Sequence, residues 1–469
     1  MLYPALPTKV HAFRYAYTFV IGIAFCASDV SAAVAVADAE LNALRNEISD
    51  MKSNYEQRIA SLEQRLARAE ANAKKTEIAR IEPAPATVSA SAPAPSPIAA
   101  TNSFNPSISL ILSGLYASQR VNSDRNPYRI DGFVPPKGEI GPPKRGFSLA
   151  ESELTMAANI DPWWSGQLTL SVPPGDGEAP SAEEAFIRTS ALPAGLKLTA
   201  GRFLSGIGYL NGQHSHTWDF SDTPLAYQAF LGGQLKNDGV QLKWLAPTET
   251  FLEFGAEALN GRGFPATSHS RNGIAMATIF AHAGGDIGDT ASWRAGASYL
   301  ATSPKDRADD DAAPSYAFTG RSKLAIADFV WKWKPEDGRS SVKVQGEYLR
   351  RLESGTLTPI GLAPENFSAL QSGWYVQSIY QFLPAWRIGF RHDALGYGRI
   401  DNTAVAAGLV PGLGRYNPKR DSVMLDWSPS EFSRIRLQYA NEKARRDAVD
   451  KQFWLHYIVS LGAHGAHNY

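Results

Sequence analysis

The chain has 469 residues, with 46 basic and 46 acidic side chains and therefore no net formal charge. This balance excludes the global basic field by which many proteins bind nucleic acid, and we expect no nucleic-acid partner. The single cysteine, Cys26, lies in an N-terminal segment that is typical of export signals. A mature chain without that segment has neither a disulfide nor a cysteine-based metal site.

Residues 1–32 have the pattern of a signal peptide. Lys9 and Arg14 precede an apolar run over 15–27, and Val30-Ser31-Ala32 is a small-residue cleavage site. The apolar run is too short for a membrane-spanning helix, and no later stretch is long and apolar enough to be one. The sequence therefore predicts an exported protein that is either soluble or crosses a membrane as strands.

Residues 39–80 are predicted to form a coiled coil. Apolar residues recur every three or four positions from Leu41 to Ala73, with one stutter between Tyr55 and Ile59, and charged residues fill the other positions. The alternative is a single amphipathic helix on the protein's own surface. Residues 81–103 are rich in Pro, Ala and Ser, which favours an extended linker without a core.

Residues 104–469 predict a barrel of strands. In 341–350, for example, Val342 and Val344 alternate with Lys343 and Gln345, so that one face is apolar and the other polar. Many such segments of membrane-spanning length indicate a lipid-facing wall around a polar interior. The predicted fold class is all-β, a transmembrane antiparallel β-barrel of about 16 strands preceded by an α-helical coiled coil.

The connections are predicted to alternate between short and long. Short turns with Trp and Pro occur at 159–164, 243–250, 330–338, 381–387 and 425–433, which suits the level of lipid head groups at one interface. The long connections are predicted at about 120–145, 174–180, 204–235, 261–272, 302–318, 354–370 and 398–417. An even strand count with both ends on the short-turn side is typical of outer-membrane barrels.

With its signal, heptads, Pro/Ala spacer, entry strand FNPSISLILSGLYA, Trp-Pro turns and terminal Tyr469, the chain resembles the Gram-negative outer-membrane porins. It is most similar to phosphate-selective and dicarboxylate-type porins, in which a periplasmic coiled coil precedes a sixteen-stranded trimeric barrel. The resemblance implies a diffusion channel for small hydrophilic solutes, without enzymatic activity or cofactor. It also implies a homotrimer in outer-membrane lipid and recognition of the C-terminal strand by the assembly machinery, although His464 and His467 depart from the usual end pattern.

The resemblance further implies that residues 204–235 fold into the lumen as a constriction loop. Its polar candidates are Tyr209, His214, His216, Asp219 and Asp222. The segment 224–235 is too apolar to remain in water, so we expect it to pack on the barrel wall or on a neighbouring subunit. The glycines of 206–212 are explained by close backbone packing and not by a nucleotide loop. Ser215 lacks the sequence context of a hydrolase nucleophile.

Seven basic residues are predicted to face the lumen: Lys243, Arg294, Lys343, Arg387, Arg391, Arg434 and Arg436. Guanidinium groups hold oxyanions, so these residues suggest an anion-leaning channel. The same strands also offer acidic residues such as Glu253 and Glu347. The alternative is that the arginines only pair with Asp426 and Glu442.

Four histidines are candidate metal ligands: His214, His216, His464 and His467. Imidazole beside carboxylates suits Zn, Ni or Cu. The alternative is that they are ordinary polar residues of a loop and a terminus. A metal site would indicate an uptake receptor for zinc-type metals or another nutrient. A second alternative function is a structural tether whose coil contacts the peptidoglycan of the cell wall.

Overall fold

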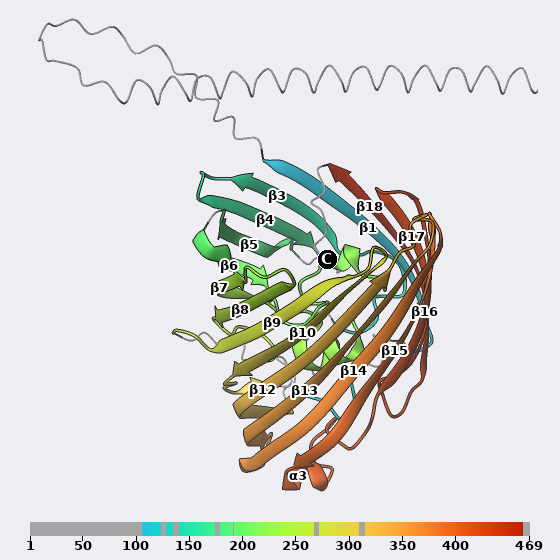
Figure 1. The fold of residues 1–469 in the computed structure, drawn as a ribbon. Coiled ribbons are helices and arrows are strands. Elements are labelled where there is room, and N and C mark those ends of the chain that lie inside the picture. Colours follow the sequence, from blue (N-terminus) through green and yellow to red (C-terminus); the bar gives the residue numbers. More distant parts are fainter. Residues whose placement is uncertain are drawn as a thin grey trace, which may run out of the picture. The chain divides into compact units, whose positions relative to one another are not determined.

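The structure is a computed structural model that describes residues 106–122, 128–134, 140–173, 179–190, 192–266, 272–308 and 315–462. The predicted signal peptide, coiled coil and linker lie outside these residues, as do His464, His467 and Tyr469. The strands of the described part follow one another around a single antiparallel sheet (Figure 1). The predicted all-β antiparallel barrel is confirmed.

The elements lie close to the predicted segments. The strands are β1 Ser107–Gln119, β2 Gly146–Leu149, β3 Ser152–Asn159, β4 Trp164–Val172, β5 Ser181–Thr189, β6 Leu196–Leu204, β7 Lys236–Leu245, β8 Phe251–Leu259, β9 Met276–Ile287, β10 Ala291–Thr302, β11 Arg307–Ala308, β12 Tyr316–Trp333, β13 Ser341–Pro359, β14 Glu365–Leu383, β15 Trp386–Asp401, β16 Lys419–Ser430, β17 Ser433–Lys443 and β18 Asp450–Gly462. The helices η1 Pro193–Gly195, η2 Ser215–Thr217, α2 Leu225–Leu231 and α3 Thr403–Ala406 lie in connections. Among the described residues, no helix has the length and apolar character needed to cross a membrane.

The barrel closes between its first and last strands. β1 pairs with β18 along one edge and with β2 and β3 along the other. β2 and β3 are two parts of one strand, and β11 is a two-residue ribbon beside β12. Merging β2 with β3 and leaving out β11 turns eighteen elements into sixteen barrel strands, which confirms the predicted count. A barrel of about sixteen strands is wide enough to hold a lumen.

One predicted long connection is wrong, because strands occupy most of it. In place of a loop over 354–370, β13 continues to Pro359 and β14 already begins at Glu365. The long connection predicted over 398–417 is present between the end of β15 at Asp401 and the start of β16 at Lys419, and it contains α3. The extended ends have an apolar face to bury, because Phe318, Leu357 and Phe367 pack with residues of the connections in a second apolar cluster.

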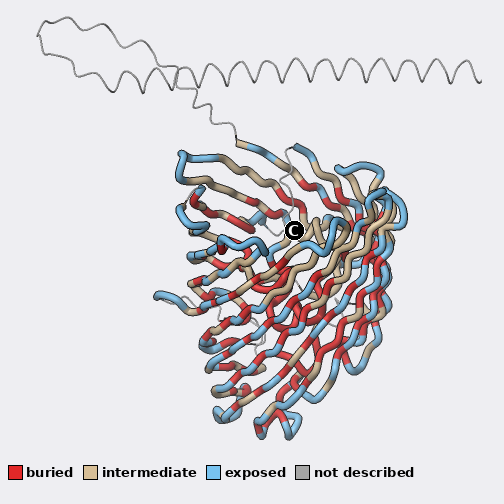
Figure 2. Tube along the Cα trace, viewed as in Figure 1, coloured by how far each residue is buried: buried red, intermediate tan, exposed pale blue. Residues whose placement is uncertain are grey.

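The two faces of each strand differ as predicted. On β13, Gln345 and Glu347 point inward and are buried, whereas Tyr348 and Leu352 point outward and remain 46% and 48% exposed. The alternation of buried and exposed residues runs along the strands (Figure 2). The outer surface is therefore an apolar belt, and the polar side chains are turned inward.

Aromatic residues gather at the short-turn rim. Trp386 and Trp427 stack with ring centroids 6.0 Å apart at the ends of β15 and β16, and Trp244 stacks on Phe254 at 5.7 Å. Trp163, in the turn before β4, is 63% exposed. This rim matches the predicted set of Trp- and Pro-containing turns.

The connection between β6 and β7 packs inside the barrel. Its residues Ile207, Leu225 and Phe230 share the main apolar cluster with wall residues such as Leu349 and Leu395. Helix α2 is completely buried and lies against β13, β14 and β15. The expectation that the apolar segment 224–235 packs on the wall is confirmed. The segment that lies in the barrel, residues 205–235, is called the inward loop below.

Candidate functional site

The two ends of the inward loop are held together by one buried side chain. The amide of Asn211 donates from Nδ2 to the carbonyl oxygens of Ser205 at 2.8 Å and of Leu235 at 2.9 Å. Its Oδ1 accepts from the backbone N–H of Leu235 at 2.7 Å. These bonds close the loop on itself, as in a compact Ω-loop.

The first residues of the loop run close against the wall. The N–H of Gly206 donates to Glu257 on β8 at 2.8 Å, and that of Gly208 donates to Ser298 on β10 at 3.1 Å. Gly208 has a φ of +65°, and a Cβ there would lie 2.5 Å from Oε2 of Glu347. Glycine therefore allows this close approach, in agreement with the packing role predicted for 206–212.

Glu347 on β13 is the acceptor for four donors. It accepts from the backbone N–H groups of Tyr209 and Leu210 at 3.2 and 3.0 Å, and from the hydroxyls of Tyr227 and Tyr375 at 2.8 and 2.7 Å. Three of these donors belong to the inward loop. The sequence does not show this role, because Glu347 there is only one of several inward acidic residues.

Asp219 ties the loop to three strands. It accepts from Lys343 at 2.8 Å, from Gln377 at 3.0 Å and from Arg387 at 3.1 Å. Although burial raises the pKa of Asp219, the charges of Lys343 and Arg387 lower it more, and the net result is a pKa below the usual range. The carboxylate therefore stays charged and holds the loop through charge-assisted bonds.

Asp222 makes a second, similar anchor. It lies 2.9 Å from Nη2 of Arg391, 2.6 Å from Nη1 of Arg420 and 2.8 Å from the amide of Gln438. Burial again opposes the charge, and Arg391 and Arg420 outweigh it to lower the pKa of Asp222. Both predicted aspartates thus fasten the loop to the wall.

Between its glycine turn and these aspartates, the loop crosses the lumen. His214 and His216 contact carboxylates on β3 and β5, whereas Asp219 contacts β13 and β15, which lie almost opposite in strand order. The five residues from His214 to Asp219 can span at most about 17 Å, so this short segment must run directly from one side of the barrel to the other. The inward loop therefore divides the interior of the barrel.

A bulge in β5 places two consecutive glutamates on the inward face. Thr169 of β4 pairs with Glu184 and the next residue, Leu170, pairs with Ala182, so Glu183 is the extra residue. Both carboxylates reach one imidazole: Oε2 of Glu183 lies 3.5 Å from Nδ1 of His214, and Oε2 of Glu184 lies 3.1 Å from its Nε2. Alternation alone predicts opposite directions for these two residues.

Glu153 on β3 completes this group. Its Oε2 lies 3.1 Å from Nδ1 of His214, and its Oε1 lies 3.0 Å from Nδ1 of His216. Suitable ligand atoms of Glu153, Glu183 and His214 all lie within 4.8 Å of one another. Burial alone would lower the pKa of His214, but the carboxylates of Glu153, Glu183 and Glu184 raise it well above the usual value. The group therefore attracts positive charge.

Eight inward basic residues surround the lumen on the short-turn side of the loop, and we call them the basic cluster: Arg188, Lys197, Lys243, Arg294, Lys332, Lys343, Arg387 and Arg434. Each lies within a few residues of the short-turn end of its strand. Lys197 is close enough to be repelled by the charges of Arg188 and Lys243. Lys332 is likewise close enough to be repelled by the charges of Lys343 and Arg294.

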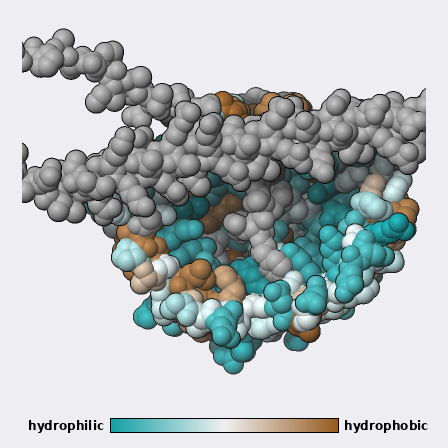
Figure 3. Space-filling model, turned by 45° about the horizontal axis from the view of Figure 1, so that its top comes forward, coloured by the Kyte–Doolittle hydropathy of each residue, from teal (hydrophilic) through white to brown (hydrophobic). Residues whose placement is uncertain are grey.

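The basic cluster is accessible and has an excess of positive charge. The side chains of Lys243, Arg387 and Arg434 are 27%, 24% and 26% exposed. Glu253, Asp219 and Asp426 pair with members of the cluster. Hydrophilic residues line the part of the inner wall that is visible in Figure 3.

The predicted lumen residues divide into two groups. Lys243, Arg294, Lys343, Arg387 and Arg434 belong to the basic cluster. Arg391 and Arg436 also point inward, but they are about 1% and 0% exposed and pair with Asp222 and Asp426. Pairing with Asp426, the alternative considered for the arginines, is present for Arg387, Arg434 and Arg436.

Other residues of the site were not predicted. The predicted strands contain three of them: Arg188, Lys197 and Lys332. Strict alternation of inward and outward residues from the end of each strand assigns these side chains to the inward face, and this signal could have identified them. Tyr209, which was predicted, lies under the guanidinium of Arg294 with 5.2 Å from Cζ to the ring centroid.

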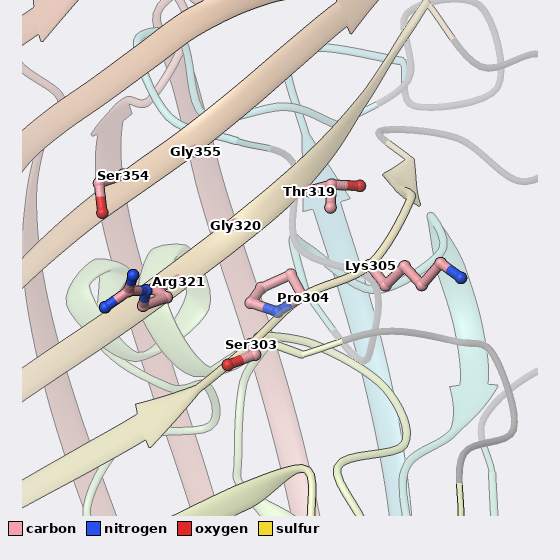
Figure 4. A pocket seen from close by; sticks show the side chains of 8 residues that line it. All are labelled: Ser303, Pro304, Lys305, Thr319, Gly320, Arg321, Ser354 and Gly355. Carbon is pink, nitrogen blue, oxygen red and sulfur yellow. The ribbon is translucent and has the colours of Figure 1, made fainter.

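A pocket of about 590 Å³ lies away from this site, between the connection that follows β10 and the neighbouring strands β12 and β13. Figure 4 shows the residues that line it, among them Lys305 and Arg321. None of the predicted site residues lines this pocket.

Fold and site together define the class: a closed sixteen-stranded antiparallel β-barrel whose interior is divided by an inward loop. A protein of Aquifex aeolicus, described as an uncharacterized protein, is 31% identical over 389 residues, covering 78% of this chain and 80% of its own. The chain belongs to the same family as that protein. No protein-family model matches the chain.

Solved barrels give more distant matches. OprB of Pseudomonas putida is 14% identical with a TM-score of 0.47, covering 76% of this chain and 94% of its own. The outer membrane channel DcaP of Acinetobacter baumannii is 11% identical with a TM-score of 0.47, over 76% and 97% of the two chains. An anion-selective porin from Comamonas acidovorans is 7% identical with a TM-score of 0.46, over 76% and 99%. Matches this distant transfer neither solute nor selectivity to this chain.

Proposed function

We propose that this protein is an outer-membrane diffusion channel for small hydrophilic solutes, with a preference for anions. The observation that carries the proposal is the pairing of an apolar outer belt with an accessible basic cluster inside the same closed barrel.

The outer belt supports a membrane location. Phe390 on β15, Tyr439 on β17 and Tyr457 on β18 are between 45% and 50% exposed, although they are large and apolar. Similar residues occur on the outward faces of strands around the barrel. Soluble monomers rarely expose a continuous apolar surface of this extent. The outer surface of a membrane-spanning barrel is apolar because it contacts the hydrocarbon chains of lipids.

The basic cluster supports the anion preference. An excess of positive charge at a water-accessible constriction raises the local concentration of anions and repels cations. Lysine and arginine also bind phosphate, sulfate and carboxylate groups through charge-assisted hydrogen bonds. The solute class that fits is therefore small oxyanions and anionic metabolites.

The proposal includes a trimer whose coiled coil, residues 39–80, extends into the periplasm and is joined to the barrel by the linker 81–103. The heptad spacing from Leu41 to Ala73 supports this part, since so narrow an apolar stripe is buried best by a second or third helix. Contact with peptidoglycan would follow from that location.

Reconstitution in a planar bilayer with asymmetric KCl tests the proposal. We expect an ohmic pore whose reversal potential has the sign of chloride preference. A barrel that does not conduct contradicts the channel. If it binds metal tightly, the uptake-receptor alternative is favoured, and if its coil captures cell-wall material, the tether alternative is favoured. A conducting pore that prefers potassium contradicts only the anion preference.

A further inference from the structure

We propose that the inward loop and the barrel wall bind a divalent transition-metal ion of the zinc or nickel class. The ligands are Nδ1 of His214 and one carboxylate oxygen each from Glu153 and Glu183. This inference goes beyond the proposed channel function and does not depend on it.

The ligand atoms have the separations that a small metal ion requires. Nδ1 of His214 lies 3.1 Å from Oε2 of Glu153 and 3.5 Å from Oε2 of Glu183. Zinc binds imidazole nitrogen and carboxylate oxygen at about 2.0–2.2 Å, so two ligands of a tetrahedral ion lie about 3.3–3.6 Å apart. The two separations from Nδ1 are close to this range, and ligand atoms of all three residues lie within 4.8 Å of one another.

Two of these atoms lack a hydrogen bond although they are buried. Glu183 is 1% exposed, and neither its Oε2 nor Nδ1 of His214 has a hydrogen-bond partner. The Glu183 oxygen lies 3.5 Å from this nitrogen, and Oε2 of Glu153 lies 3.1 Å from the same nitrogen. Leaving such groups buried without a partner is costly, and a shared cation would satisfy both.

The proton on His214 is placed so that Nδ1 can bind a metal. A carboxylate can only accept, so Nε2 of His214 donates its proton to Glu184 at 3.1 Å. A metal ion that takes the place of the proton on Nδ1 would bind the lone pair that faces the oxygens of Glu153 and Glu183. A lone pair between two carboxylates is repelled unless a positive charge lies among them. The bulge in β5 creates this arrangement, because it turns Glu183 and Glu184 to the same side.

Two further residues orient the ligands. Glu184 fixes the ring of His214, in the carboxylate–histidine–metal pattern common around zinc. His216 contacts the other oxygen of Glu153 at 3.0 Å, which leaves Oε2 directed at His214. His216 therefore acts as a positioning residue.

The donor set selects the metal class. One imidazole nitrogen and two carboxylate oxygens suit zinc or nickel, whereas calcium and magnesium prefer six or more oxygen ligands. Since His214 belongs to the inward loop and both glutamates to the wall, a bound ion would clip the middle of the loop to β3 and β5.

Isothermal titration calorimetry of the full-length protein in detergent with ZnCl2, NiCl2 or MgCl2 tests this inference. We expect one zinc ion per chain and no comparable heat from magnesium. His214→Gln and Glu183→Gln should each weaken zinc binding by at least 100-fold. Glu184→Gln should weaken it about 10- to 100-fold, as expected for a partner of a ligand.

Two variants are matched controls. His282 is an inward histidine that contacts a single carboxylate, Glu253, at 3.1 Å, so His282→Gln should leave zinc binding unchanged. The double variant His464→Gln/His467→Gln should also retain it. If that double variant loses zinc binding, the metal belongs to the chain end and the inference is wrong.

A second measurement does not depend on any variant. Crystals of the unaltered protein grown with ZnCl2 should give an anomalous scattering peak within bonding distance of Nδ1 of His214. Absence of zinc binding at neutral pH, or a peak elsewhere, would show that His214 is held among the carboxylates by a proton alone. A failure here leaves the channel proposal intact, because conductance is measured separately.

Discussion

Asp222 in the inward loop lies 2.6 Å from the guanidinium of Arg420 on β16, and both residues are almost completely buried. The same carboxylate also reaches Arg391 on β15, so a single loop residue pairs with two wall cations. Removing one member of a buried ion pair costs far more than removing a surface pair, because the remaining charges are left without compensation.

Asp222→Asn should therefore loosen the loop. We expect a loss of about 1.5–3 kcal/mol in the free energy that holds the loop on the wall, because charge-assisted hydrogen bonds are lost while Asp393 and Glu442 still pair with these arginines. Limited proteolysis of the folded barrel should show faster cleavage within 205–235. Asp289→Asn, in an exposed short turn, is the control and should leave the cleavage rate unchanged.

The charge of the lumen should be adjustable without disturbing the loop. Lys197→Glu with Lys243→Glu reverses two members of the basic cluster on β6 and β7, away from the strands β13 to β17 that hold Asp219 and Asp222. A unit charge about 8 Å from a permeating ion contributes about 0.5 kcal/mol in water, so the chloride-to-potassium permeability ratio should fall severalfold. The reversal potential measures this change.

The matched control reverses two charges on the outer face. Lys323 and Arg350 are exposed and point away from the lumen, so Lys323→Glu with Arg350→Glu should not move the reversal potential. An equal shift in both double variants would mean that selectivity follows total charge and not the basic cluster.

Tyr227→Phe should destabilise the docked helix α2 by about 1–3 kcal/mol, because the mutation removes a buried donor to Glu347 and leaves part of that carboxylate unsatisfied. Urea unfolding, followed by the fluorescence of the protein's tryptophans, measures the difference. Tyr348→Phe changes the same hydroxyl on the outward face of β13 and should have little effect. Equal losses in the two variants contradict a specific role for the Tyr227 bond.

Docking of the loop should resist mild acid. Burial raises the pKa of Asp219, but Lys343 and Arg387 lower it below the usual range. A carboxylate with a lowered pKa stabilises the folded state above its unfolded value of about 3.9 and loses that effect as the pH falls toward its folded value. Open-channel noise should therefore stay constant from pH 7 to pH 5 and rise only below about pH 4. A rise in noise near pH 6 would show that the titration of a group other than Asp219 controls the docking of the loop.

Deletion of residues 39–80 should weaken the proposed trimer only modestly, because barrel walls also associate. Sedimentation in detergent at decreasing protein concentration measures the change. Trimers that persist undiminished at every concentration would leave the coil without a role in assembly.

The sequence predicts the wall much better than the interior. Alternation at Val342 to Gln345 and the Trp-Pro turns are local signals, so strand positions and facing follow from them. The docking of the loop depends on contacts between residues far apart in sequence, such as Tyr227 with Glu347, and no local sequence pattern predicts such contacts. The bulge at Glu183 is also hidden, because strict alternation assigns its side chain to the outer face. Arg391 and Arg436 were placed on the correct face, but only the folded loop shows that they are covered.

The contacts of the inward loop also indicate when, during folding, the loop can dock. Its chain emerges after β6, yet Ser221 contacts His456 on β18 and Asp222 contacts Gln438 on β17. These partners are the last strands to be synthesised, so the loop cannot complete its contacts until the C-terminal strands are in place. Contacts so distant in sequence form late in folding. The constriction therefore becomes fully anchored only when β17 and β18 have joined the wall.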